Sequence, residues 1–240
     1  MDLWGRIFAD HWRGEIHPHT FVRDDGRRHT IASAAEYFDQ PREVVEVRAL
    51  NELSGRVLDL GCGAGTYALF LEQRGVSVTA IDSSPGAVDV CRARGCRDAR
   101  AADIDLFESS ADSFDAIICM GNTLGINKDP ATLPKRLSRL RTFTKSSGRL
   151  IAAVRDPLNT TDPEHLSYHR RNRAAGRPVG LTRSRLEYRG ELGEWWELWM
   201  PTRSEMQEAA GRGGWSLLRT SEAGLATLYE LAPVPWIADG

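Results

Sequence analysis

The stretch RVLDLGCGAGT, residues 56–66, is the part of the sequence that decides the fold class. It begins with a short apolar run, residues 57–60, of the kind that forms a buried strand. A cluster of glycines follows directly, and residues 66–74 then carry the apolar spacing of a helix. Glycine permits positive φ and close backbone approach, so a ligand can lie against the main chain where that helix begins. The glycines of this loop are Gly61, Gly63 and Gly65.

Strands and helices alternate along the chain around this loop. Short apolar runs bounded by turns predict strands at residues 76–81, 99–102, 114–120 and 149–155. Helical spacing is found at residues 42–53, 85–94 and 133–143. Such alternation is typical of a parallel sheet covered by helices on both faces, and right-handed crossovers then give a doubly wound layout. The sequence therefore predicts an α/β fold.

The composition of the 240 residues excludes several classes of protein. With 41% apolar residues the chain is long enough to bury a real core, which excludes disorder of the whole chain. No apolar run approaches the ~20 residues of a membrane span, and the first residues lack the apolar stretch of a signal peptide. We therefore expect a cytoplasmic protein. The formal net charge of −2 argues against a dedicated nucleic-acid binder.

The cysteines and histidines do not form a recognisable metal site. The N-terminal histidines, His17, His19 and His29, are scattered, with no acid or thiol at a ligand spacing. We therefore expect no metal. The four cysteines show no paired spacing, which indicates free and mostly buried thiols. They are Cys62, Cys91, Cys96 and Cys119.

Two acids near the glycine loop indicate what kind of ligand it holds. Asp82 ends the next predicted strand, 17 residues beyond Gly65, where a carboxylate can bind both hydroxyls of a ribose. The alternative is that Asp82 and the two serines after it only cap a helix. Asp59 lies inside the apolar run, where a carboxylate needs a partner. A dinucleotide loop would carry a glycine where this chain has Thr66, which disfavours a nicotinamide coenzyme.

The run VLDLGCGAGT, residues 57–66, resembles the first motif of the class I S-adenosylmethionine-dependent methyltransferases. In motif order the resemblance covers residues 43–155. It implies a Rossmann-like sheet of seven strands, one of them antiparallel, and S-adenosylmethionine as the cofactor.

The resemblance also implies roles for individual residues. It places Asp59 at the methionine end of the cofactor, and Tyr37 in the region where many members place an aromatic ring over that end. Asp82, with Ser83 beside it, matches the ribose-binding acid. The remaining matches are the backbone of the glycine turn (Gly61, Cys62, Gly63, Gly65), the adenine site (Asp103, Ile104) and the reaction centre (Met120, Gly121, Asn122).

The whole chain, residues 1–240, is expected to form a single methyltransferase domain. Its parts would be an N-terminal helical cap (1–42), a cofactor-binding core (43–156), a substrate lid inserted after the fifth strand (157–182) and antiparallel strands at the edge of the sheet (183–240). Those edge strands are expected near residues 184–190, 194–200 and 225–231.

The lid carries the candidates for a general base, if the reaction needs one. His165, Tyr168, His169 and Asn172 recur at steps of three and four residues, so they would share one face of a helix. Asp156 follows the fifth strand and could reach the same place. A histidine has a suitable pKa for removing a proton from the acceptor. The alternatives are a solvated helix, and a pairing of Asp156 with a neighbouring arginine.

These features favour methyl transfer to an oxygen or nitrogen of a small molecule, possibly a secondary metabolite, by a monomer or homodimer. One alternative is an RNA methyltransferase that uses the arginine-rich stretch 170–189. Others are a non-catalytic cofactor-binding protein and a nicotinamide dehydrogenase. The Asn/Asp-Pro-Pro-aromatic motif of base and glutamine methylases is absent, since residues 121–124 read GNTL.

Overall fold

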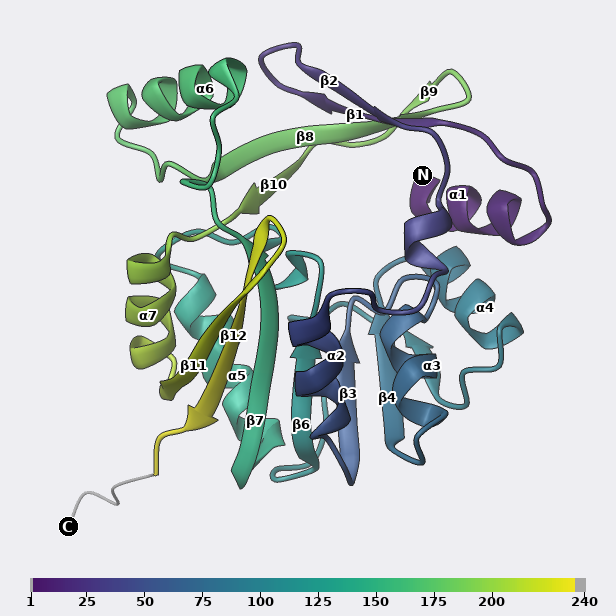
Figure 1. Cartoon of the computed structure of the whole chain (residues 1–240), viewed down its shortest axis with the longest axis vertical. Helices are drawn as coiled ribbons and strands as arrows, with labels where there is room; N and C mark the ends of the chain where they lie inside the picture. Colours follow the sequence, from purple (N-terminus) through teal and green to yellow (C-terminus); the bar gives the residue numbers. More distant parts are fainter. Residues whose placement is uncertain (1, 236–240) are drawn as a thin grey trace.

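The core of the protein is a seven-stranded sheet. The computed structural model describes residues 2–235. The strands follow the order β11-β12-β7-β6-β3-β4-β5, and β12 is antiparallel to both of its neighbours while the other six run in one direction. The predicted doubly wound, mostly parallel sheet with one antiparallel strand is confirmed (Figure 1). The strands are β3 (Arg56–Leu60), β4 (Ser77–Asp82), β5 (Ala99–Ala101), β6 (Phe114–Cys119), β7 (Thr144–Arg155), β11 (Trp215–Ala223) and β12 (Ala226–Pro233).

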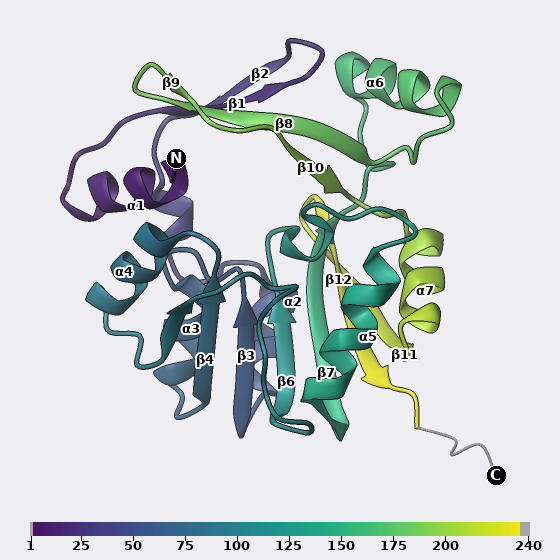
Figure 2. The same cartoon turned by 180° about the vertical axis from the view of Figure 1, so that it is seen from behind.

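Helices cover both faces of the core sheet, because successive side chains of a strand point to opposite sides. Val57 packs into an apolar cluster with residues of α2, α3 and α4, whereas Leu58 packs into the cluster that includes α5 and α7. Figures 1 and 2 show these two layers from opposite sides. The helices are α2 (Val44–Asn51), α3 (Thr66–Glu72), α4 (Pro85–Ala93), α5 (Leu133–Phe143) and α7 (Arg203–Arg212).

A second, smaller sheet lies above the carboxyl edge of the core strands (Figure 1). Its strands follow the order β10-β8-β1-β2, with β9 also paired to β8, and all of these pairs are antiparallel. We call this sheet and the two helices beside it the lid. The lid consists of α1 (Leu3–Trp12), β1 (His19–Arg23), β2 (Arg28–Ile31), α6 (Pro163–Ala174), β8 (Leu181–Tyr188), β9 (Glu191–Leu192) and β10 (Trp196–Trp199).

The lid sheet corrects two sequence-based expectations. The strands expected at residues 184–190 and 194–200 do exist, but they do not lie at the edge of the core sheet. Strand β8 pairs instead with β1, so the segment expected to form an N-terminal helical cap supplies its central partner as a strand. The core edge is built by the hairpin of β11 and β12, and the sequence had indicated only the second of these strands.

Helix α1 holds the lid against the core by packing closely on α4. A Cβ atom at Gly86 would lie 2.7 Å from the Cα atom of Gly5, so the two backbones touch. The Asp2 carboxylate accepts hydrogen bonds from Ser84 Oγ at 2.8 Å and from the Gly86 backbone N–H at 3.0 Å. These contacts place α1 next to the turn that follows β4. None of the helices in residues 2–235 has the length and apolar character that a bilayer crossing requires.

Candidate functional site

The glycine loop after β3 is held in a tight, left-handed course. Gly61, Gly63 and Gly65 have φ angles of 75°, 53° and 91°, a region that side chains disfavour. A Cβ atom at Gly61 would also lie 2.4 Å from the Thr123 methyl group. The loop therefore requires glycine both for its backbone conformation and for its close approach to the turn after β6.

The loop uses several of its own backbone donors within the fold. The N–H groups of Gly61 and Cys62 both donate to the Ile81 carbonyl, at 2.8 and 3.0 Å. The Gly63 N–H donates to Asp82 Oδ2 at 2.9 Å. This qualifies the expectation that the glycine turn binds a ligand through its backbone, because these three donors already have partners. The N–H groups of Gly61, Cys62 and Gly63 are therefore not available to a ligand, although the loop lies at the edge of the sheet.

Asp82 stands at the carboxyl end of β4, directly beside the loop. Besides Gly63, its carboxylate accepts a hydrogen bond from the Ser84 N–H at 2.9 Å. Burial raises the pKa of Asp82 above its ordinary value, more than its backbone donors lower it. Ser83 is exposed next to it. The acid therefore ties the loop to β4 while lying at the sheet edge where open α/β folds bind ligands.

The adenine-site candidates lie one strand further along the same edge. Strand β5 pairs with β4 in parallel, with Asp82 opposite Ala101, so Asp103 follows β5 close to this end of β4. Asp103 is exposed, and its carboxylate accepts a hydrogen bond from the Asp105 N–H at 2.7 Å. Ile104 is half-buried against the core.

Asp59 is the least satisfied polar residue of the core edge. It lies in β3 with 1% of its surface exposed, and its Oδ2 atom has no hydrogen-bond partner among residues 2–235. Burial is the main cause that raises its pKa to about 7, and the neighbouring Asp82 adds to this. A buried carboxylate oxygen without a partner is costly, so its presence indicates a ligand that donates a hydrogen bond or carries a positive charge.

The turn after β6 connects this edge to β7. Met120 is buried, and Gly121 and Asn122 adopt positive φ angles of 63° and 67°. The Asn122 side-chain oxygen accepts a hydrogen bond from the Arg155 backbone N–H at 2.6 Å. Asn122 therefore fixes the end of β7 as well as facing the edge of the sheet.

Aromatic residues of the lid pack over the glycine loop. A Cβ atom at Gly63 would lie 3.6 Å from the Phe8 ring. The Tyr37 ring packs against Phe8 and Trp4, with centroids 5.2 and 5.4 Å apart, and burial raises the pKa of its hydroxyl. The Tyr37 carbonyl accepts a hydrogen bond from Thr66 Oγ1, which ties this segment to the start of α3. Tyr37 thus lies near the loop, and its role over the methionine end of the cofactor stays a prediction.

The environment of His19 is unusual. It is fully buried in β1, and neither ring nitrogen has a hydrogen-bond partner among the described residues. Its ring packs on Trp4, Phe21 and Tyr37. Burial lowers its pKa, which favours the neutral imidazole. Only its position in a half-apolar strand could have signalled this burial.

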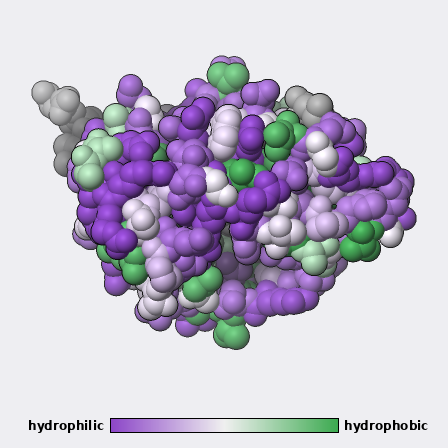
Figure 3. Space-filling view, turned by 90° about the horizontal axis from the view of Figure 1, so that it is seen from above, coloured by the Kyte–Doolittle hydropathy of each residue, from purple (hydrophilic) through white to green (hydrophobic). Residues whose placement is uncertain are grey.

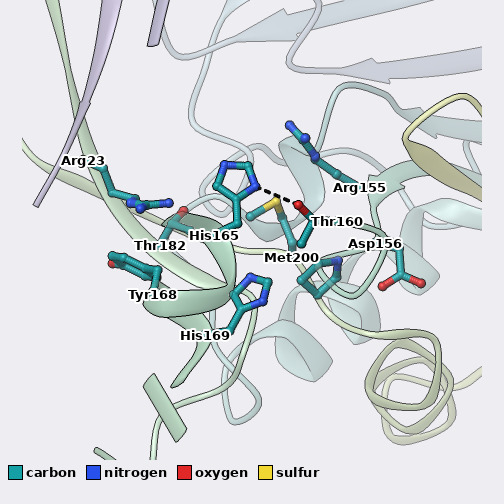
Figure 4. Close-up of a pocket in the computed structure, with 10 residues that line it drawn as sticks. Arg23, Arg155, Asp156, Thr160, His165, Tyr168, His169, Thr182 and Met200 are labelled. Atoms are coloured by element: carbon teal, nitrogen blue, oxygen red, sulfur yellow. Dashed lines mark hydrogen bonds between the residues drawn. The ribbon is translucent and has the colours of Figure 1, made fainter. Parts of the chain in front are cut away.

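A cavity of about 110 Å³ lies between α6, β8 and the end of β7. Figure 4 shows its lining side chains, which come from both the lid and the core. His165, Tyr168, His169 and Asp156 all line it. Asn172, on the same helix, is buried instead, and its side-chain amide donates to the carbonyls of Val179 and Leu181. The lining residues are Arg23, Arg155, Asp156, Pro157, Thr160, His165, Tyr168, His169, Thr182 and Met200.

The two histidines of this cavity are better proton acceptors than Tyr168 or Asp156. Burial, reinforced by nearby arginines, lowers the pKa of both His165 and His169, so each imidazole is neutral near pH 7. The Tyr168 hydroxyl donates to Asp24 at 2.8 Å, and burial, helped by that acid, raises its pKa. Asp156 accepts a hydrogen bond from the Leu158 N–H at 2.8 Å.

One group of possible metal ligands lies away from this edge. Oxygen and nitrogen atoms of Asp10, Glu15 and His17 come within 4.8 Å of one another. Arg13 and Arg189 form ion pairs with both of these acids, so arginines already balance their charge. The four cysteines are buried and free, as predicted.

Comparison with known proteins gives a match to one family over part of the chain, and a fold over nearly all of it. Residues 57–148 match the family described as methyltransferase domain. Two curated relatives are ubiquinone biosynthesis O-methyltransferases. That of Xanthomonas oryzae is 36% identical over 122 residues, which cover 48% of each chain, and that of Xylella fastidiosa is 36% identical over 113 residues, 42% of this chain and 46% of the relative. The chain therefore spans about half the length of the curated relatives it matches.

Solved structures share the fold over a greater length. A methyltransferase from Bacteroides fragilis, in complex with S-adenosyl-L-homocysteine, aligns with a TM-score of 0.82 and 22% identity, covering 98% of this chain and 95% of that one. The CcbJ methyltransferase of Streptomyces caelestis aligns with a TM-score of 0.64 and 14% identity, covering 84% and 96%. At these identities the likeness concerns the fold.

Proposed function

We propose that this chain, whose residues 57–148 belong to the methyltransferase domain family, transfers a methyl group from S-adenosylmethionine to an oxygen or nitrogen atom of a small-molecule acceptor. The observation that carries the proposal is the buried, unpartnered Asp59 oxygen beside the glycine loop and Asp82. The names of the curated relatives support a small acceptor and, of the two atoms, oxygen.

The residues of the core edge fit this cofactor. Asp59 would pair with the ammonium group at its methionine end, which supplies the missing partner of the buried carboxylate. Asp82 would accept hydrogen bonds from the ribose hydroxyls, with Ser83 exposed beside it. Asp103 and Ile104 would hold the adenine, and Tyr37 and the aromatic residues of α1 would shield the methionine end from water. When bound, S-adenosylmethionine supplies a methyl group activated by a sulfonium.

The lid cavity would hold the acceptor. His169 and His165, neutral and half-enclosed, would take the proton from the attacking oxygen or nitrogen, which a general base accelerates by roughly 10²–10⁴-fold. Asn122 would keep the end of β7, and with it the cavity wall, in register with the cofactor site. Holding the two reactants in a fixed orientation between lid and core would raise the rate further, because it replaces an encounter in solution.

Two finer points belong to the same proposal. Four buried, reduced cysteines are typical of a cytoplasmic protein, and we place the chain there. The chain would act as a monomer or homodimer, on an acceptor that is not a nucleic acid.

Calorimetric titration with S-adenosylhomocysteine tests the cofactor site. The wild-type chain should bind it, and Asp82→Ala should weaken binding by about 10- to 100-fold through loss of charge-assisted hydrogen bonds. Asp115→Ala is the matched control, because Asp115 lies near the opposite end of the core strands. That variant should bind S-adenosylhomocysteine as the wild type does. Equal affinity of wild type and Asp82→Ala would refute the role of Asp82.

A further inference from the structure

We propose that the lid cavity recognises a carboxylate group on the acceptor, through the guanidinium of Arg155. This inference rests on the proposed methyl transfer, and it adds that the acceptor is a carboxylic acid.

The cavity has a positive charge that the protein does not neutralise. Arg155 is half-buried, and its side chain forms no hydrogen bond or ion pair with any residue in the range 2–235. Arg23, the other lining arginine, is already paired with Asp25 through two hydrogen bonds of 2.8 and 2.7 Å, and its guanidinium lies over the Tyr168 ring. Arg155 is therefore the cation of this cavity that remains available to a ligand.

The acid in the lining does not cancel this charge. One oxygen of Asp156 is engaged by the Leu158 N–H, and Figure 4 shows the carboxylate directed away from His165. In the same view the His165 imidazole lies between the side chains of Arg23 and Arg155. After burial, the charges of Arg27, Arg155 and Arg23 all contribute to lowering the pKa of His165, against the opposing effect of Asp162. Arginine guanidiniums on several sides of His165 thus favour an anion at this place in the cavity.

The remaining polar groups suit a planar, singly charged anion. An arginine guanidinium donates two parallel hydrogen bonds to a carboxylate, a geometry that a neutral amide cannot reproduce. His169 is 7% exposed and has no hydrogen-bond partner within the described range, so its imidazole remains available as the proposed base beside the bound carboxylate. His165 contacts Thr160 Oγ1 at 3.3 Å through one nitrogen only. Pro157, Tyr168 and Met200 provide apolar walls for the rest of the molecule.

The position of Arg155 would let a bound carboxylate orient the acceptor. It is the last residue of β7, and its backbone N–H is held by Asn122 in the turn that faces the glycine loop. A carboxylate bound by Arg155 would fix one end of the acceptor at this junction and direct the rest towards the edge where the cofactor is proposed to bind. Arg155 would then be a specificity-determining residue.

Binding of benzoate and of its neutral isostere benzamide to the full-length chain saturated with S-adenosylhomocysteine tests the proposal. We expect benzoate to bind about tenfold more tightly than benzamide, the advantage of a charge-assisted pair. Arg155→Gln should reduce this ratio to about one, since the variant removes the charge but no contact that the fold uses. Arg170→Gln is the matched control, because Arg170 lies on the exposed side of α6 outside the cavity, and it should leave the ratio unchanged.

The outcomes separate this proposal from the proposed function. Equal binding of the two probes by the wild type, or a preference for benzoate that persists in Arg155→Gln, would overturn carboxylate recognition. Failure of S-adenosylhomocysteine to bind would contradict the cofactor site instead, and the ratio of the two probes would then be measured on the chain alone, with the same expected values.

Discussion

The buried carboxylate of Asp59 lacks, among the described residues, a hydrogen-bond partner for one of its oxygens. Its folded pKa of about 7 lies above the ordinary value of 3.8, so its contribution to stability is present below about pH 4 and is lost as the pH rises through about 7. Above that pH the folded state must hold a buried charge with an unpartnered oxygen. A cationic group of a ligand, bound at Asp59, would remove this penalty. We therefore regard Asp59 as a ligand-binding residue.

Replacement of Asp59 by Asn should therefore stabilise the unliganded protein and weaken its binding of S-adenosylhomocysteine. The free energy of unfolding of Asp59→Asn should exceed that of the wild type by a few kcal/mol at pH 8 and by little at pH 4. Denaturant unfolding at the two pH values, and titration with S-adenosylhomocysteine, measure the two effects.

Asp115→Asn is the control for the sign of this effect. Backbone and lysine donors lower the pKa of Asp115, so its stabilising contribution is present above about pH 4 and is lost as the pH falls through its folded value. Its removal should destabilise the protein at pH 8. If Asp59→Asn is also destabilising at pH 8, the carboxylate has a structural partner and is not reserved for a ligand.

His169 should govern the acidic side of the rate profile. Because its pKa is lowered, the neutral base should persist below the ordinary histidine value of about 6.5, and kcat should fall only at more acidic pH. His169→Ala should reduce kcat by about 100-fold or more, with unchanged affinity for S-adenosylhomocysteine. His29→Ala, at an exposed position of β2, is the control and should leave kcat unchanged. A profile of His169→Ala that matches the wild type at every pH would exclude His169 as the base.

At the level of elements, the core apart from β11 could be predicted from the sequence, whereas the pairing of the lid strands could not. Strand β3, its glycine loop and α3 follow one another within residues 56–72, so local patterns determine them. The lid sheet depends on the pairing of β1 with β8, which lie about 160 positions apart in the chain. No short-range signal reports such a pairing. The same limit explains why Arg155 and Arg23 were not predicted in the cavity, whereas the histidine face of α6 was.

The contact between α1 and α4 predicts a clear difference between two glycine substitutions. Gly86→Ala places a methyl group 2.7 Å from the Gly5 backbone, so α1 must move, at a cost of about 1–3 kcal/mol. Gly211→Ala, in α7, has no atom within 4 Å of the new methyl group and should stabilise by roughly 0.5–1 kcal/mol.

Thermal unfolding and limited proteolysis measure this pair. Gly86→Ala should expose the N-terminal segment before β3 to cleavage and lower the affinity for S-adenosylhomocysteine, because α1 and Tyr37 cover the glycine loop. Gly211→Ala should do neither. Unchanged stability of Gly86→Ala would mean that α1 does not pack on α4 in solution.

For the whole molecule, the arrangement of two sheets explains the arginine-rich stretch 170–189. Several of its arginines are engaged within the lid: Arg171 pairs with Asp24, Arg189 with Asp10, and Arg183 and Arg185 lie over the Trp195 ring. Seen from above, the lid surface is largely hydrophilic with scattered hydrophobic residues (Figure 3). These four arginines therefore serve the structure of the lid.

This arrangement predicts that RNA is not the acceptor. Fluorescence anisotropy with a labelled RNA at physiological salt should show only the weak binding of non-specific contacts, with a Kd no tighter than about 10⁻⁶ M. No methyl group should be transferred to the RNA. Tight binding that weakens steeply with added salt would instead favour the RNA methyltransferase alternative.

The carboxyl edge of β3 and β4 is proposed to bind an S-adenosyl compound between core and lid. A crystal structure of the full chain with S-adenosylhomocysteine tests it most directly. We expect the amino group of the ligand within hydrogen-bond distance of Asp59 Oδ2, and the ribose hydroxyls on the carboxylate of Asp82. A ligand bound elsewhere, or an Asp59 that stays unpaired while the ligand is present, would contradict cofactor binding at this edge.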